Sequence, residues 1–141
     1  MTDLALRPGI RQAAASLHKG GIVAYPTEAV WGLGCDPENN RAVQNLLALK
    51  RRDPSKGLIL IAADIAMFAP YLHGLKPALV EQLQNSWPGA ITWLIPNNHT
   101  ASPWISGGRD TLATGIDIGQ PPGPATGKII DEGQSVFRQY P

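Results

Sequence analysis

Cysteine, long apolar runs and an excess of one charge are scarce in these 141 residues. A single cysteine, Cys35, excludes an internal disulfide, so we expect a buried thiol in a cytoplasmic protein. No apolar run approaches the length of a membrane span, and the first residues lack the pattern of a signal peptide. Charged residues make up only 16% of the chain. The formal net charge of +1 means that the chain lacks the overall positive charge typical of nucleic-acid-binding proteins.

The hydrophobic content of 43% is enough for one folded domain over residues 1–141. Segments of helical spacing alternate with short apolar runs, which predicts an α/β layered domain. We expect Asp36 and Pro37 to begin one helix, Pro77 to open another, and Pro26 to Cys35 to form a loop. The predicted helices cover 9–19, 36–50, 64–72 and 76–87, and the predicted strands cover 22–25, 58–62 and 90–95.

From about residue 96 onward the periodic pattern is lost. Glycine and proline crowd this region, and only short apolar pieces interrupt them. We therefore expect an irregular C-terminal region. A compact domain rarely holds so long a structureless stretch, so either this region is a functional loop or part of the usual fold is absent.

Two groups of polar residues suggest a binding site for a small anion. Thr27 and Glu28 follow the first predicted strand, in a loop whose glycines let a ligand approach the backbone. A basic cluster lies at the end of the second predicted helix and can donate to phosphate or carboxylate oxygens. It consists of Lys50, Arg51, Arg52 and Lys56. Neither group is a Walker or Rossmann motif, and the three histidines lack metal-ligand spacing, so no metal site or catalytic residue is predicted.

Four segments follow one another in a specific order along the chain. They are Gly21 to Asp36, Lys50-Arg51-Arg52, Lys56 to Ile61, and Trp87-Pro88-Gly89-Ala90-Ile91-Thr92. Together they resemble the YrdC/TsaC family, which makes threonylcarbamoyl-AMP. The first is similar to the family's opening strand and loop, the second to its Lys-x-Arg element, the third to its second strand and the fourth to its Trp-Pro-Gly-Pro-x-Thr element.

The resemblance implies an open, twisted mixed β-sheet flanked by helices, with a shortened C-terminal part. It also implies condensation of L-threonine, bicarbonate and ATP with Mg²⁺, after which partner proteins modify adenosine in tRNA. By the same likeness Thr27 would hold threonine, while Lys50 and Arg52 would face the triphosphate and the carbamate, and we place Lys56 with them in the substrate-binding set. No protein nucleophile is needed for this chemistry.

The family pattern breaks after Ala113. Gly115 stands where the resemblance implies an arginine, and the family's Ser-x-Ser-Ala-Asn segment has no counterpart, which predicts an internal deletion. Three functions therefore stay open. The chain is a threonylcarbamoyl-AMP synthase, a non-catalytic nucleotide- or RNA-binding member of the family, or a carbamoyl-transfer module like those within larger maturation proteins.

Overall fold

The computed structural model describes residues 8–26, 31–87, 92–116 and 135–137. Its main sheet has four strands in the order β4-β5-β3-β6. These strands cover Trp93–Pro96 (β4), Thr111–Ile116 (β5), Ile59–Ala62 (β3) and Ser135–Phe137 (β6). β3 runs parallel to both β5 and β6, whereas β4 is antiparallel to β5. The predicted α/β class with a mixed sheet is confirmed.

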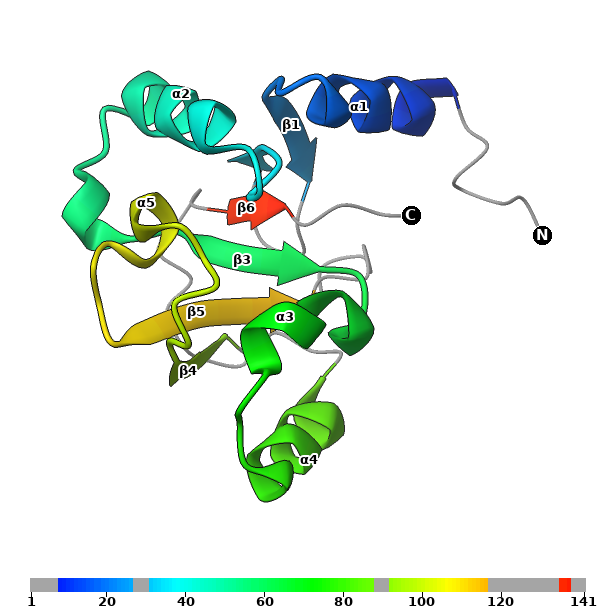
Figure 1. Ribbon diagram of the computed structural model, residues 1–141. Helices are drawn as coiled ribbons and strands as arrows, with labels where there is room; N and C mark the ends of the chain where they lie inside the picture. The colour runs from blue at the N-terminus through cyan, green and yellow to red at the C-terminus, as the bar shows by residue number, and fades with distance from the viewer. Residues whose placement is uncertain (1–7, 27–30, 88–91, 117–134, 138–141) are drawn as a thin grey trace.

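The helices lie at both ends of this row of strands. In Figure 1 α1 and α2 lie beyond β6, and α4 lies beyond β4. α1 covers Pro8–His18, α2 covers Asn40–Lys50 and α4 covers Pro77–Ser86. Shorter pieces are η2 (Pro54–Lys56), η3 (Ile65–Phe68), α3 (Ala69–Leu72) and α5 (Pro103–Ser106). As expected, Pro77 opens α4, because the first turn of a helix does not need its backbone N–H.

A separate two-stranded hairpin corrects the predicted loop from Pro26 to Cys35. β1 (Val23–Pro26) pairs antiparallel with β2 (Trp31–Gly34), with Val23 opposite Gly34. The glycines at 32 and 34 suggested a loop, because glycine weakens a strand when it is considered alone. Here β1 provides the partner strand, and both glycines are buried at positions where backbone approaches backbone.

The start of α2 also differs from the expectation. Asn39, not Asp36, is the N-cap, and its side-chain oxygen accepts from the Ala42 N–H at 3.1 Å. The Asp36 carboxylate instead accepts from the Glu38 N–H at 2.9 Å, in a turn that the Asn39 N–H closes onto the Asp36 carbonyl. Two potential caps three residues apart compete, and the turn at Pro37 moves the helix start to Asn40.

The region expected to be irregular from residue 96 contains regular structure as far as Ile116. It includes α5 and β5, and β5, with six residues, is the longest strand of the sheet in the described ranges. β5 lies between β3 and β4, and Thr114 within it is fully buried. The sequence of β5 contains Gly115 and two threonines, so its position inside the sheet stabilises it more than its own propensity does. Residues 117–134 lie outside the described part.

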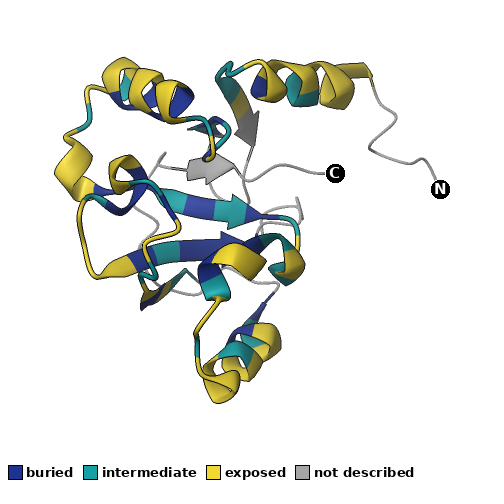
Figure 2. Cartoon of the chain, viewed as in Figure 1, coloured by how far each residue is buried: buried dark blue, intermediate teal, exposed yellow. Residues whose placement is uncertain are grey.

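The core fills the space between the sheet and the helices. Figure 2 shows buried residues along β3 and β5 and exposed residues on the outer sides of α1 and α4. Leu46 of α2, Leu60 of β3 and Phe68 of η3 are fully buried, and the Phe68 ring lies 5.6 Å from the Trp87 ring. This core supports the C-terminal end of α2, where the predicted basic cluster lies.

Candidate substrate-binding site

The basic turn, residues 50–57, joins the end of α2 to the start of β3. Lys50 is the last residue of α2, and its side-chain nitrogen is shielded from solvent. Arg51 follows in the left-handed conformation at φ 50°, and its exposed side chain lies at the surface. The N–H groups of Arg51 and Arg52 bond to the carbonyls of Ala48 and Leu47, at 3.1 and 3.0 Å. This hydrogen-bond pattern closes a helix C-terminus and fixes the direction in which the chain leaves it.

Arg52 is half-buried, and a hydrogen bond across the turn holds its side chain. Its Nε donates to the Gly57 carbonyl at 2.9 Å. The guanidinium also carries two terminal nitrogens, and donors in this forked arrangement suit carboxylate and phosphate oxygens. The bond also places Arg52 beside the residues that lead into β3.

The remaining residues of the turn form a short helix with its own cap. Asp53 is the N-cap of η2, and its carboxylate accepts from the Ser55 N–H at 2.9 Å. Hydrogen bonds from the Ser55 backbone and then from its side chain lower the pKa of the Asp53 carboxyl, and Lys56 acts in the same direction. Lys56 ends η2 and is exposed. The turn thus holds four cations and one carboxylate in eight residues, although the whole chain carries a formal charge of only +1.

α5 lies against this turn. The Leu58 N–H donates to the Ile105 carbonyl at 2.7 Å, and α5 contacts both η2 and α2. Ile105 and Ser106 are buried, so the contact is shielded from bulk solvent. The sequence reading missed this support, and its only signal was the Gly107-Gly108 pair, which we interpreted as part of an irregular region.

Of the predicted substrate-binding residues, the structure brings three together. Lys50, Arg52 and Lys56 share the basic turn, with Lys50 and Arg52 more buried and Lys56 exposed. Thr27, like Glu28, lies outside the described residues. β1 ends at Pro26, which pairs with Trp31, so Thr27 directly follows the hairpin's last described pair. The position of Thr27 relative to the basic turn stays a prediction.

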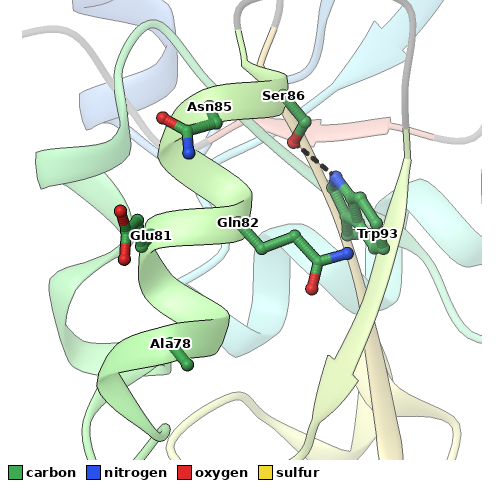
Figure 3. Close-up of a pocket in the computed structure, with 6 residues that line it drawn as sticks. All are labelled: Ala78, Glu81, Gln82, Asn85, Ser86 and Trp93. Atoms are coloured by element: carbon green, nitrogen blue, oxygen red, sulfur yellow. Dashed lines mark hydrogen bonds between the residues drawn. The ribbon is translucent and has the colours of Figure 1, made fainter.

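A hollow of different chemistry lies between α4 and β4. This α4 groove has a volume of about 450 Å³, and Figure 3 shows the side chains that line it. They are Ala78, Glu81, Gln82, Asn85, Ser86 and Trp93. The Trp93 Nε1 donates to the Ser86 Oγ at 2.7 Å, and that hydroxyl donates to the Leu83 carbonyl at 3.0 Å. Its single charged lining residue is Glu81, so the groove does not suit an anionic substrate.

Cys35 is placed as predicted and takes no part in the site. It is fully buried, and burial, with a smaller contribution from the Asp36 carboxylate, raises the pKa of its thiol to about 12. A thiol in this state is a poor nucleophile. Within the described ranges, no three His, Cys, Asp or Glu side chains gather as a metal site. No helix in those ranges is long and apolar enough to cross a bilayer.

Comparison with known proteins places this architecture in a family. The Sua5/YciO/YrdC family model, whose description reads "Telomere recombination", matches residues 15–131. The chain belongs to the Sua5/YciO/YrdC family. The matched range includes the hairpin, the basic turn, the α4 groove and β5 of this family member.

Curated relatives of this family member carry one name. The threonylcarbamoyl-AMP synthase of Halorhodospira halophila is 57% identical over 107 residues, covering 76% of this chain and 56% of that protein. The threonylcarbamoyl-AMP synthase of Cellvibrio japonicus is 48% identical over 113 residues, covering 80% of this chain and 60% of that protein. The chain therefore spans little more than half the length of these relatives.

Solved structures of the family share the fold. Sua5 of P. abyssi complexed with L-threonine has a TM-score of 0.68 and 32% identity, covering 76% of this chain and 32% of that chain. YciO of E. coli has a TM-score of 0.62 and 17% identity, covering 89% of this chain and 75% of that chain. These similarities place the sheet and its helices in a known arrangement.

Proposed function

We propose that this chain works as a threonylcarbamoyl-AMP synthase. The amine of L-threonine and bicarbonate form a carbamate with loss of water. A carbamate oxygen then attacks the α-phosphorus of ATP, which gives threonylcarbamoyl-AMP and releases pyrophosphate. The observation that carries the proposal is the basic turn, within a chain 57% identical over 107 residues to a protein named for this reaction. A single domain over residues 1–141 would hold this activity.

In this proposal the turn supplies fixed positive charge. Lys50 and Arg52 bind the triphosphate and the carbamate, Lys56 meets the outer phosphate oxygens, and Thr27 holds threonine. The reaction needs negative charge to be stabilised on phosphate oxygens rather than a protein nucleophile. The bond from Arg52 to Gly57 supports this role, because a guanidinium held in place loses little freedom when it binds its ligand.

Mg²⁺ would arrive with ATP rather than occupy a dedicated protein site. Mg²⁺ commonly binds through substrate phosphates and one or two carboxylates, and it would neutralise charge on the leaving pyrophosphate. Transfer of the carbamoyl group to tRNA, with the help of partner proteins, and a cytoplasmic location remain predictions.

A non-catalytic binding protein of the same family is the second candidate. Gly115 favours it, because the resemblance implies an arginine at this position and the structure has a buried glycine there, opposite Ile61 of β3. The predicted absence of the Ser-x-Ser-Ala-Asn segment points the same way. Each lost donor commonly costs on the order of 10² in rate, so turnover would be slow even if ATP bound well.

Pyrophosphate release separates the two candidates. The chain is incubated with ATP, Mg²⁺, L-threonine and bicarbonate, and with each component left out in turn. We expect release that depends on both threonine and bicarbonate, at a rate far below that of the Halorhodospira halophila enzyme measured in parallel. ATP binding without threonine-dependent release would contradict the synthase proposal and favour the binding protein. Absence of ATP binding would contradict the synthase and the nucleotide-binding form of the second candidate, leaving only its RNA-binding form.

A further inference from the structure

The α5 end meets the basic turn at Gly107 with no space for a side chain. Gly107 has φ 67°, and its N–H bonds to the Pro103 carbonyl at 2.9 Å. A Cβ placed on Gly107 would lie 2.7 Å from the Ser55 carbonyl oxygen and 2.9 Å from both the Gly57 nitrogen and the Pro54 carbonyl oxygen. All three atoms belong to the backbone of the basic turn, so none can rotate away as a side chain could.

A chain of contacts leads from Gly107 to the Arg52 side chain. Gly107 touches the backbone at Gly57, and the Gly57 carbonyl accepts the hydrogen bond from the Arg52 Nε at 2.9 Å. Gly57 has φ 70° and ψ 176°, a conformation that is essentially confined to glycine, and its own Cβ would lie 3.1 Å from the Ile105 carbonyl oxygen. Two glycines, one on each side, therefore allow this close contact.

We propose that Gly107 is a positioning residue for Arg52. Because position 107 has no side chain, α5 can pack close against residues 54–57. This packing keeps the Gly57 carbonyl within hydrogen-bond distance of the Arg52 Nε. A Cβ at position 107 would displace this backbone and release the guanidinium. The role in ATP binding rests on the function proposed above, whereas the contact between Gly107 and the turn does not.

Gly108 provides a matched control. It has φ 72°, close to that of Gly107, but a Cβ on Gly108 would find nothing within 4 Å. Alanine at either position incurs the same kind of strain in the left-handed region. Only Gly107→Ala adds a clash with the basic turn, so the difference between the two variants isolates the contact.

The first measurement needs no ligand. The Arg52 Nε–H signal is followed by NMR in the full chain and identified by its loss in Arg52→Lys. We expect Gly107→Ala to shift this signal or increase its exchange with water, and Gly108→Ala to leave it close to that of the parent. If Gly107→Ala does not fold, the parent chain decides instead. Its Arg52 Nε–H should exchange with water slowly, like the Leu58 N–H that α5 holds through the Ile105 carbonyl, and free exchange would overturn the proposal.

The second measurement is ATP affinity by calorimetry, with thermal stability recorded for every variant. We expect Gly107→Ala to weaken binding roughly 10-fold or more relative to Gly108→Ala, since small misplacements of a binding group are costly. In an Arg52→Ala background this difference should disappear, because the two changes would remove the same interaction.

The outcomes keep this proposal separate from the proposed function. A changed Arg52 signal without any ATP binding by the parent supports positioning and removes the proposed function. Equal Arg52 signals in Gly107→Ala and Gly108→Ala overturn positioning, whatever the parent binds. An undiminished affinity difference in the Arg52→Ala background also overturns it, because Gly107 would then act by a route that does not involve Arg52.

Discussion

The basic turn and the α4 groove differ in the way each is held in place. The turn has the end of α2, whose inner face is buried, on one side and α5 on the other, and at least two hydrogen bonds reach across its backbone. The groove has a volume of about 450 Å³, but it lies on the edge strand β4, where the Trp93–Ser86 bond joins its two walls. The proposed substrate site therefore rests on charge and rigid support rather than on volume.

The largest expected difference between the two regions is in the packing beneath them. Leu46, in the C-terminal half of α2, is fully buried, whereas Leu94, next to Trp93 in β4, is 66% exposed. Leu46→Ala should lower the free energy of unfolding by about 2–5 kcal/mol, and Leu94→Ala by less than about 0.5 kcal/mol. Urea denaturation measures both, and equal losses would contradict the contrast.

ATP affinity should separate the regions next. Lys50→Ala and Arg52→Ala each remove a charged donor, and bonds of that kind contribute about 1.5–3 kcal/mol, which is roughly 10- to 100-fold in affinity. Calorimetry with Mg²⁺ present measures this change. Arg41→Ala is the matched control, because Arg41 is an exposed cation near the other end of the same helix. Glu81→Gln in the groove should also leave the affinity unchanged.

A smaller effect is expected from the bond that joins the groove walls. Trp93→Phe removes the 2.7 Å bond to the Ser86 hydroxyl and keeps most of the ring. The loss should be about 1 kcal/mol in unfolding free energy, with ATP affinity unaltered. A change in ATP affinity would show that the groove and the basic turn are coupled.

The smallest effect concerns pH. The pKa of Asp53 is lowered in the folded chain, so its carboxylate stabilises the fold above its ordinary pKa of about 3.9. That contribution is lost as the pH falls through the lowered value. Asp53→Asn should therefore lower the urea midpoint at pH 7, and the gap from the parent should close at lower pH. A gap that stays constant down to pH 2 would exclude this linkage.

Hydrogen exchange adds a test of the sheet. Ile59 to Ala62 and Thr111 to Ile116 are central strands with buried neighbours, so their amides should be among the most protected. This expectation replaces the fast exchange that an irregular C-terminal region would give at Thr114. Fast exchange at Thr114 would mean that β5 opens independently of β3.

The sequence was informative where local signals and tertiary contacts agreed. A continuous apolar run such as Leu58 to Ala62 favours a buried strand, and the structure has β3 there. A proline before a helical pattern, such as Pro77, favours a helix start, and α4 begins at this residue. β2 and β5 were missed because their glycines and threonines form strands only when neighbouring strands supply hydrogen bonds and burial. Asn39 replaced Asp36 as the cap because the two are equivalent at the level of residue type.

In the candidate site, too, the local features could be predicted from the sequence and the tertiary contacts could not. Lys50, Arg52 and Lys56 could be predicted as a basic cluster from their spacing and their resemblance to a family motif, because they lie at or just after the end of one helix. The support from Ile105 and Gly107 comes from a segment about fifty residues away in the chain. Contact of this kind leaves no local pattern, so only the folded structure reveals it.

The buried cysteine makes the chain convenient for site-specific chemistry. Cys35 is enclosed by the core, with a thiol pKa of about 12, so maleimide reagents at neutral pH should pass it by while the chain is folded. A fluorophore or spin label attached to a cysteine newly introduced on the exposed side of α2 would then report on the basic turn alone. The natural thiol would not have to be removed, and the packing around it would remain intact.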